Sequence, residues 1–408
     1  MKAARFVFSV VALGVGVAAV AADWPQFRGP DRTGLSKETG LLKSWPEGGP
    51  KLVWKATGLG QGHTTISVAS GKIFGMGLVG SDENVWALEE KSGKLLWSVK
   101  IANGTTLGAS QGGNGSRATP TIDGNLLYTI GVSGDVVCLK VSDGSLVWRK
   151  HLVRDFGGEV PAWGYCESPL VDGNRVVVTP GGTNSVVALD KKTGETIWKS
   201  ELSNRVSYSS ALTATINGQK QYIQFLGGGV FGLSPLNGKP IWSYTSPANR
   251  QQINCSMPIV QGDMVFAATA YQTGGGLAKV NGKQTEEQYF LREMQNHHGG
   301  MVLVGDYLYG TGNNSLMCVE FKTGKISWES RNPGKGSIAY ADGLLYVRNE
   351  RGPMTLVEAN PKEYVQKGQF EQPDRTREPA WAYPVIANGK LYVHDMDTLL
   401  CYDVKGGN

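Results

Sequence analysis

The sequence predicts an all-β protein, an eight-bladed β-propeller with four antiparallel strands in each blade, on the basis of two observations. First, one motif recurs five times: an apolar alternating strand, a tight turn and then Gly-x-x-x-Trp. Second, the motif's tryptophans lie 51, 50 and 44 residues apart, and the last interval of 86 equals two periods with one degraded copy. A period of about 40 to 50 residues made of strand and turn signals, without a helical stretch, is typical of propeller blades.

The tryptophans of the motif are expected to be structural. They recur once per repeat, as residues wedged between neighbouring blades would, whereas a ligand site needs an aromatic ring only once. The expected docking residues are Trp54, Trp97, Trp148, Trp198, Trp242 and Trp328. Trp163 and Trp381 stand outside the repeat and are better candidates for contact with a ligand.

A second turn precedes the motif within each unit. It is often Asn-Gly or Asp-Gly, which tolerate the positive φ of two-residue hairpin turns. Two hairpins per period give a four-stranded blade. The turns are Ser70-Gly71, Asp123-Gly124, Asp172-Gly173, Asn217-Gly218, Asp342-Gly343 and Asn388-Gly389. The predicted units are 63–99, 116–152, 167–202, 209–244, 255–294, 297–330, 335–370 and 380–403.

Two units depart from the pattern. The last one ends before its outer strand, which the segment 51–58 can supply with Trp54 in the docking position. We therefore predict that this N-terminal strand closes the ring and leaves no open sheet edge. The stretch 271–294 has three consecutive glycines and no docking tryptophan. The simplest interpretation is a blade whose outer hairpin has drifted; the alternative is a lid over the channel.

Composition agrees with one closed ring. The chain has 56 glycines in 408 residues, 40% hydrophobic and 18% charged residues, so it can bury a large core while spending much of its length in turns. Residues 51–408 are expected to form a single propeller domain, because a closed ring of repeats is one unit. Residues 23–50 form an N-terminal extension, in which Trp24, Phe27 and Trp45 either pack against the ring or contact a partner.

Residues 1–22 have the pattern of a secretory signal peptide. Lys2 and Arg5 precede an apolar run over residues 6–20 that ends in small residues. The run is shorter than the roughly 20 residues of a membrane span. We expect export to the periplasm or the extracellular space, without a membrane span. Removal of this segment lowers the net charge from +5 to +3, which is too weak to indicate a nucleic-acid partner.

The five cysteines fall into two sets. Cys138, Cys318 and Cys401 share one repeat position, where other blades carry Ala or Gly, so they are expected to pack as small hydrophobes. Cys166 and Cys255 share a second position on blades that are not neighbours. Their Cα atoms are expected to lie beyond the roughly 7 Å that a disulfide allows, so we predict no disulfide.

The repeat resembles a known family. The pattern ALDKKTGETIW at 188–198 is similar to the tryptophan-docking repeat of pyrroloquinoline quinone (PQQ) dehydrogenases and of the outer-membrane assembly lipoprotein BamB. Segments 23–34, 295–300 and 370–375 resemble a narrower group of exported PQQ-like repeat proteins. The resemblance covers almost the whole mature chain. It is specific for the fold, and it does not select an activity, because enzymes and scaffolds share the repeat.

The resemblance supports two functions. The preferred one is a non-catalytic, monomeric binding or scaffold protein of the cell envelope, with a protein or polysaccharide partner. The alternative is a PQQ-dependent alcohol or sugar dehydrogenase, in which Glu167 would hold calcium or act as base and Arg117 would pair with quinone oxygens. The adjacent cysteine pair and the Cys-x-x-Cys-His haem motif of such enzymes are absent, and their ligand set is matched only by Glu167 and Asn254. No catalytic residue is assigned, and PQQ with calcium stays a possible cofactor.

Polar and aromatic residues just before the first strand of each blade are expected at the channel mouth, where a ligand would bind. The candidate ligand-binding residues are Arg117, Glu167, Tyr208, Asn254, His297 and Trp381, accompanied by His63, Tyr165, His298 and Lys335. The alternative is that these residues are polar because a channel contacts water. A sugar-binding module would instead use Tyr165, Tyr208 and Trp381 as stacking platforms.

The pair His297-His298 precedes Gly299-Gly300. Adjacent side chains on a strand point to opposite faces, so both imidazoles would meet one ligand only if these glycines turn the backbone. We expect a hydrogen-bonding role for one histidine and no metal site, because few further ligands are at hand.

Overall fold

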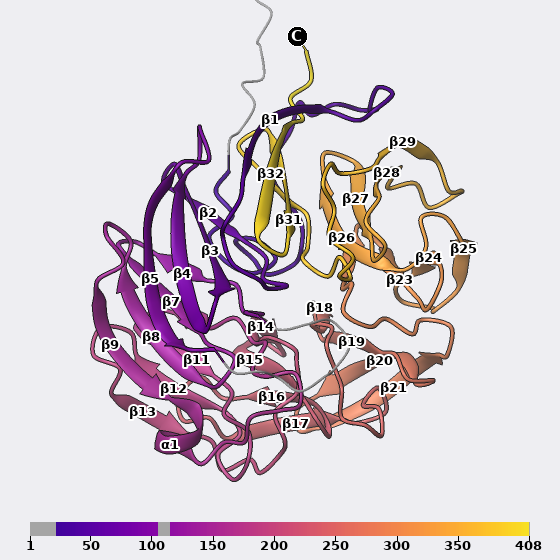
Figure 1. The fold of residues 1–408 in the computed structure, drawn as a ribbon. Coiled ribbons are helices and arrows are strands. Elements are labelled where there is room, and N and C mark those ends of the chain that lie inside the picture. Colours follow the sequence, from indigo (N-terminus) through magenta and orange to yellow (C-terminus); the bar gives the residue numbers. More distant parts are fainter. Residues whose placement is uncertain (1–21, 105–114, 408) are drawn as a thin grey trace, which may run out of the picture.

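The computed structural model describes residues 22–104 and 115–407. Eight four-stranded sheets follow one another around a ring, and Figure 1 shows the chain running round it from indigo to yellow. The predicted eight-bladed propeller of four-stranded antiparallel blades is confirmed. The predicted signal peptide lies outside the described residues, except for Ala22. Within the described ranges, no helix has the length and apolar character needed to cross a membrane.

The first four blades follow the predicted units closely. Blade 1 contains β2 (Ser67–Ala69), β3 (Lys72–Val79), β4 (Asp82–Glu89) and β5 (Leu95–Asn103). Blade 2 contains β6 (Thr121–Asp123), β7 (Leu126–Ile130), β8 (Asp135–Lys140) and β9 (Leu146–His151). Blade 3 contains β10 (Leu170–Asp172), β11 (Arg175–Val178), β12 (Val187–Asp190) and β13 (Thr196–Lys199). Blade 4 contains β14 (Leu212–Ile216), β15 (Gln219–Leu226), β16 (Gly229–Leu233) and β17 (Pro240–Tyr244).

The remaining blades complete the ring. Blade 5 contains β18 (Ile259–Gln261), β19 (Met264–Thr269), β20 (Gly274–Asn281) and β21 (Gln284–Leu291). Blade 6 contains β22 (Met301–Val304), β23 (Tyr307–Thr311), β24 (Leu316–Glu320) and β25 (Ile326–Ser330). Blade 7 contains β26 (Gly336–Ala341), β27 (Leu344–Asn349), β28 (Met354–Glu358) and β29 (Gln366–Phe370). Blade 8 contains β30 (Val385–Ala387), β31 (Lys390–Asp395), β32 (Thr398–Asp403) and β1 (Lys51–Ala56).

Blade 8 joins the two ends of the propeller. Strand β1 pairs antiparallel with β32, and Trp54 lies opposite Cys401 in the register. The predicted closure by the N-terminal strand is therefore confirmed. One short element was not anticipated: the five-residue helix α1 (Leu152–Phe156) interrupts the strands after blade 2, with His151 as its N-cap.

The docking tryptophans link most blades to the next by hydrogen bonds, whereas the indole of Trp242 donates to Gln221 of its own blade. The indole N–H of Trp97 donates to the main-chain carbonyl of Val141 in the following blade at 3.2 Å. A Cβ added to Gly144 would lie 2.7 Å from the same indole, so this position must be glycine to accept the ring. Equivalent bonds to the next blade are made by Trp54, Trp148, Trp198 and Trp328.

Blades 5 and 7 use substitutes for the docking tryptophan. In blade 5 the ring of Tyr289 covers Gly324, and its hydroxyl donates to the Phe321 carbonyl at 2.8 Å. The stretch 271–294 is thus an outer hairpin, as predicted, and not a lid. In blade 7 the docking position is Gly368, and Trp45 of the N-terminal extension packs on it.

Each outer strand carries a β-bulge one residue before its docking position. In blade 1, for example, Leu95 and Trp97 pair with consecutive residues of β4, and Leu96 is skipped. A bulge re-aims the side chain of the extra residue and disrupts an exposed sheet edge. The bulged residues are Val53, Leu96, Val147, Ile197, Ile241, Gln288, Ser327 and Lys367.

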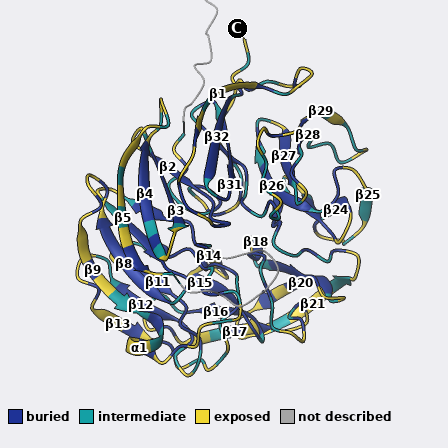
Figure 2. Cartoon of the chain, viewed as in Figure 1, coloured by how far each residue is buried: buried dark blue, intermediate teal, exposed yellow. Residues whose placement is uncertain are grey.

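The core lies between neighbouring blades. Figure 2 shows strands that are mostly buried toward the centre and exposed residues on the outermost strands. One apolar cluster, for example, joins residues of blades 1, 2 and 3. Cys138, Cys318 and Cys401 are buried directly opposite docking tryptophans, as their shared repeat position predicted. All five cysteines are free thiols.

Residues 23–45, which we call the plug, cross the channel lined by the inner strands. Trp24 forms an isolated bridge with Val68 of blade 1, and Leu35 forms one with Tyr340 of blade 7. Trp24 and Trp45 are only 2% and 7% exposed, which places both against the ring. The interpretation as a packing segment is therefore correct for these two tryptophans.

Two buried arginines fix the plug to the ring. Arg32 donates to the main-chain carbonyls of Ala211, at 2.8 Å, and of Ser168 and Pro169. Arg28 donates to the Met301 carbonyl and, at 2.8 Å, to the Thr33 carbonyl. These guanidinium groups donate hydrogen bonds to buried carbonyls at the inner edges of blades 3, 4 and 6, and carbonyls in the interior need such partners.

Candidate functional site

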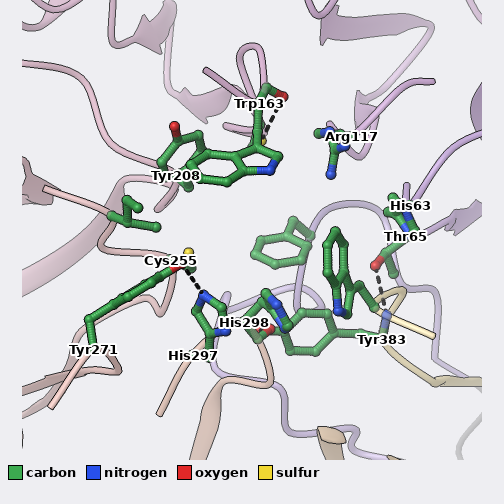
Figure 3. A pocket seen from close by; sticks show the side chains of 14 residues that line it. His63, Thr65, Arg117, Trp163, Tyr208, Cys255, Tyr271, His297, His298 and Tyr383 are labelled. Carbon is green, nitrogen blue, oxygen red and sulfur yellow. Dashed lines mark hydrogen bonds between the residues drawn. The ribbon is translucent and has the colours of Figure 1, made fainter. Parts of the chain in front are cut away.

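A pocket of about 160 Å³ lies at the centre of the ring. It is bounded by the segments that precede the first strands of several blades, and Phe27 of the plug contributes to its wall. Figure 3 shows the labelled side chains arranged around one common space. Of the six residues predicted to bind a ligand, four line it: Arg117, Tyr208, His297 and Trp381. His63 and His298 line it as well.

The repeat explains why these residues meet. Each precedes the inner strand of its own blade, so residues far apart in the sequence occupy equivalent places around the channel. Cys166 and Cys255 illustrate this, because their shared position puts both on the pocket wall although they come from different blades.

The two histidines face the pocket together. Their rings stack with centroids 3.9 Å apart, because residues 297–300 form a bend before β22 in which Gly300 has a φ of 65°. His297 Nε2 lies 3.1 Å from the Tyr271 hydroxyl, and its Nδ1 lies 3.2 Å from Lys335 Nζ. The strand rule of opposite faces therefore does not apply to this pair.

Glu350 contacts both Trp381, which lines the pocket, and Lys335. Its carboxylate accepts a hydrogen bond from Trp381 Nε1 at 2.5 Å and pairs with Lys335 at 3.1 Å. His298 Nε2 lies 3.7 Å from the same carboxylate. The Trp381 ring packs between His63 and His298, with centroid distances of 4.5 and 4.4 Å. These contacts hold Trp381 in one orientation on the wall.

Burial keeps His297, His298 and the two thiols of the pocket uncharged at neutral pH. Desolvation, helped by Lys335, lowers the pKa of His297 to about 4. Desolvation and the neighbouring His297 lower the pKa of His298 well below its usual value. Burial raises the pKa of the Cys166 thiol to about 11 and raises that of Cys255 as well. Neither thiol is the activated thiolate that nucleophilic catalysis uses.

Aromatic side chains also form much of the pocket wall. The rings of Trp163 and Tyr208 meet edge to face at 5.7 Å, and the Arg117 guanidinium lies 5.8 Å from the Trp381 ring centre. Trp163 and Trp381, the two tryptophans that stand outside the repeat, both line the pocket. Phe27 and Tyr383 also contact each other edge to face at 5.2 Å in the wall.

Glu167 and Asn254 lie away from the pocket. The Glu167 carboxylate is 1% exposed and accepts hydrogen bonds from the amide and hydroxyl of Thr179, both at 2.7 Å. The Asn254 amide donates to the carbonyls of Leu226 and Gly227. Tyr165 is fully buried and donates to the Pro180 carbonyl at 3.0 Å. These side chains hold strands and loops together.

These contacts do not fit PQQ with calcium held by Glu167 and Asn254. Both side chains are already hydrogen-bonded inside the protein, away from the cavity. The cavity is also smaller than the roughly 300 to 1,000 Å³ of pockets that take drug-sized ligands. Among residues 22–104 and 115–407, no group of three or more His, Cys, Asp or Glu side chains could hold a metal ion.

Several lining residues were missed from the sequence. Phe27 and Tyr383 are contributed by the plug and by the segment before β30, and Tyr271 comes from the turn after β19. Glu350, which contacts the lining residue Trp381, directly follows β27, where no inner-strand rule points to the channel. The shared position of Cys166 and Cys255 was the one signal that could have added residues to the site.

A ring of eight blades, most of them docked by tryptophan, defines a PQQ-like β-propeller. The family described as "Outer membrane protein assembly factor BamB" matches residues 81–330, and the chain belongs to this family. Its relatives include tetrathionate hydrolase of Acidithiobacillus ferrooxidans, 22% identical over 92% of this chain and 81% of the relative. BamB of Burkholderia pseudomallei is 28% identical over 60% of this chain, which spans 64% of that protein, less than two thirds of its length.

Solved structures agree on the fold. BamB from Moraxella catarrhalis superposes with a TM-score of 0.62 at 14% identity, covering 88% of this chain and 98% of that one. The quinohemoprotein alcohol dehydrogenase of Comamonas testosteroni gives a TM-score of 0.66 at 12% identity, covering 95% and 81%. At these identities the likeness concerns the fold alone.

Proposed function

We propose that this protein is an exported, non-catalytic binding protein of the cell envelope, whose rigid ring holds a protein partner on one part of its rim. The observation that carries the proposal is a set of exposed aliphatic side chains on the outer strands of four consecutive blades, 8, 1, 2 and 3. We call this set the apolar arc: Leu52, Val53, Leu95, Leu96, Leu146, Val147 and Ile197, each between 39% and 54% exposed.

The bulges make the arc specific to one side of the ring. The bulged residue is aliphatic and exposed in blades 8, 1, 2 and 3, whereas blades 5, 6 and 7 carry Gln288, Ser327 and Lys367 at the same position. Every blade has this bulge, whether the bulged residue is aliphatic or polar. The fold itself therefore does not require aliphatic residues at this position. Exposed apolar groups that gather on one surface are typical of protein contacts.

Charge follows the same division for blades 5 and 6, whereas β29 of blade 7 contains Lys367 and no Asp or Glu. Strands β1, β5, β9 and β13 contain six Lys or Arg residues and no Asp or Glu. Two of these, Lys55 and Lys100, pair with Asp374 and Asp82. Strands β21 and β25 contain glutamates and no Lys or Arg. The arc therefore suits a partner with apolar side chains surrounded by carboxylates, and a polysaccharide, which lacks aliphatic side chains, suits it less.

Site-specific photo-crosslinking in the native host tests the partner. A crosslinking amino acid at Leu96 or Val147 should give one defined protein adduct, and the matched positions Gln288 and Ser327 should give none. Equal adducts at both sets of positions, or none at either, would remove the support for a partner on the arc.

Calorimetric titration with PQQ and calcium tests the alternative, a dehydrogenase. No heat is expected for the wild-type protein or for Glu167→Ala, because this carboxylate is already committed to Thr179. Tight, near-stoichiometric binding that is lost in Glu167→Ala would establish the quinoprotein function instead.

A further inference from the structure

We infer that the central pocket binds one small neutral aromatic molecule that carries a hydroxyl group, of the phenol class, with its ring between the aromatic walls and its O–H donated to His298 Nδ1. This inference goes beyond the proposed function and does not depend on the apolar arc, because the pocket lies at the centre of the ring and the arc lies on outer strands. It rests on the walls of the cavity, on its volume and on the hydrogen bonds that its lining already makes.

The walls of the pocket suit a flat apolar body. Trp163 and Tyr208 meet edge to face on one side of the common space in Figure 3. On another side the imidazoles of His297 and His298 stack, and Trp381 packs against the second of them. Aromatic rings contact one another favourably when they are offset face to face or meet edge to face. A planar ring between these sides can therefore make favourable contacts with both.

The volume of the cavity limits the ligand to a single ring. It is about 160 Å³, and an engineered apolar cavity of about 150 Å³ is known to bind benzene. A polycyclic molecule would need a larger space. Tyr271 contributes to the wall and is 36% exposed, so the lining reaches the surface of the molecule.

Several polar groups of the lining are already bonded to the protein. Trp381 Nε1 donates to the Glu350 carboxylate at 2.5 Å, and the Tyr383 hydroxyl donates to the main-chain carbonyl of His298 at 2.7 Å. The two ring nitrogens of His297 lie 3.1 and 3.2 Å from polar atoms of other side chains. A sugar of one ring carries several hydroxyl groups, each of which needs a partner when it is buried. This lining therefore suits a ligand with a single polar group.

The imidazole of His298 is the group that can bind the hydroxyl. It lines the pocket, and among residues 22–104 and 115–407 its ring nitrogens have no hydrogen-bond partner, since Nε2 lies 3.7 Å from the Glu350 carboxylate. Burial lowers the pKa of His298 well below its usual value, so the ring is neutral at pH 7. The nearby carboxylate favours the proton on Nε2, which leaves Nδ1 as an acceptor. A ligand that donates an O–H group to Nδ1 satisfies this acceptor.

Burial also favours a neutral ligand over an anion. It keeps the imidazoles of His297 and His298 and the thiols of Cys166 and Cys255 uncharged at pH 7. An ionised ligand would lose its hydration in the same way, whereas a phenol, with a pKa of about 10, enters as a neutral molecule. Because Arg117 also lines the pocket, benzoate is the comparison that decides between the two classes of ligand.

Phenol is the probe, and three molecules of similar size are its controls. In calorimetry and tryptophan fluorescence at pH 7, phenol should bind one site on the purified full-length protein. Toluene, which has a methyl group in place of the hydroxyl, should bind about fivefold less tightly, the equivalent of one hydrogen bond. Cyclohexanol, which lacks the aromatic ring, and benzoate, which carries a charge, should each bind at least about fivefold less tightly than phenol. These comparisons need no variant, so they stand even if a substituted pocket fails to fold.

Substitutions at two lining residues locate the site. Cys255→Met places a longer side chain in the cavity and should weaken phenol binding about tenfold or more, whereas the matched variant Cys255→Ala keeps the cavity open and should leave binding within about threefold. His298→Phe keeps a ring and removes both nitrogens. It should weaken phenol binding about fivefold and leave toluene binding within about twofold. Thermal unfolding checks that each variant is folded.

Several results would overturn the inference. These are the absence of phenol binding, binding of cyclohexanol or benzoate that equals or exceeds that of phenol, and unchanged phenol binding in a folded Cys255→Met protein. Phenol binding that is unchanged in His298→Phe, or that falls only as much as toluene binding, would overturn the hydrogen bond to Nδ1.

Discussion

Arg32 of the plug and Glu167 of the segment before β10 are both buried in the interior, and each shifts the pKa of the other toward the charged form. Burial nevertheless dominates, and it raises the pKa of Glu167 to about 7 and lowers that of Arg32 to about 10. The carboxylate that the sequence suggested as a calcium ligand or base thus supports the attachment of the N-terminal segment to the ring.

This pair makes stability depend on pH. Between the ordinary carboxyl pKa of 4.5 and the folded value of about 7, the folded protein holds a proton on Glu167 that the unfolded chain has lost. The contribution of Glu167 to the free energy of unfolding is therefore complete below pH 4.5 and is lost as the pH rises through 7. From pH 5 to pH 8, wild type should lose about 2.5 kcal/mol more than Glu167→Gln.

Urea unfolding at both pH values measures this difference. His297 and His394, whose pKa values burial lowers to about 4, act in the opposite direction, but both proteins share them and their effect cancels. Identical pH profiles for the two proteins would show that Glu167 titrates normally.

Arg32→Met should destabilise the protein by about 3 to 5 kcal/mol, because it leaves Glu167 without its cation and removes one hydrogen-bond donor from each of the carbonyls of Ser168, Pro169 and Ala211. Chemical unfolding gives the free energy, and limited proteolysis reports release of the plug. Arg154→Gln is the matched control and should change stability by less than about 0.5 kcal/mol. Equal stability of the two variants would contradict the role of Arg32.

Tyr289 should behave as a docking residue. Tyr289→Phe removes only its bond to the Phe321 carbonyl and should cost about 1 kcal/mol. Tyr289→Ala also removes the ring that covers Gly324 and should cost about 2 to 4 kcal/mol. The two costs are measured by urea unfolding, and a harmless Tyr289→Ala would mean that blades 5 and 6 are held together by other contacts.

Thiol titration checks the cysteines. Denatured, unreduced protein should yield five thiols, because all five cysteines are free. The native protein should react slowly at pH 8, since burial raises the pKa of Cys166 to about 11 and that of Cys401 to about 12. Fewer than five thiols in the denatured protein would reveal a disulfide.

Most of the fold could be predicted from the sequence repeat. Docking residues, hairpin turns and the missing outer strand are local patterns, so blade number and ring closure could be predicted from them. The residues that replace the docking tryptophan in blades 5 and 7 could not be predicted, because nothing near Tyr289 or Gly368 in the sequence resembles Gly-x-x-x-Trp. Trp45 packs on Gly368 across more than 300 residues of sequence, and a contact of that kind has no local signature.

The site was predictable in part for the same reason. Arg117, Tyr208, His297 and Trp381 precede inner strands, and this position alone brings them to the pocket. Glu167 and Asn254 satisfy the same rule, yet their side chains turn toward neighbouring main-chain and side-chain groups. Which way a side chain turns depends on partners such as Thr179 and Leu226 that the repeat does not specify.

The pairing of β1 with β32 also sets the order in which the molecule can be completed. Synthesis proceeds at about 5 to 20 residues per second, so the chain between Ala56 and Thr398 takes roughly twenty seconds to a minute to make. Throughout that time the earliest strand has no neighbour to pair with. Strand β1 must therefore stay apart from other chains until β32 is available to pair with it, and only then can the ring become one cooperative structure.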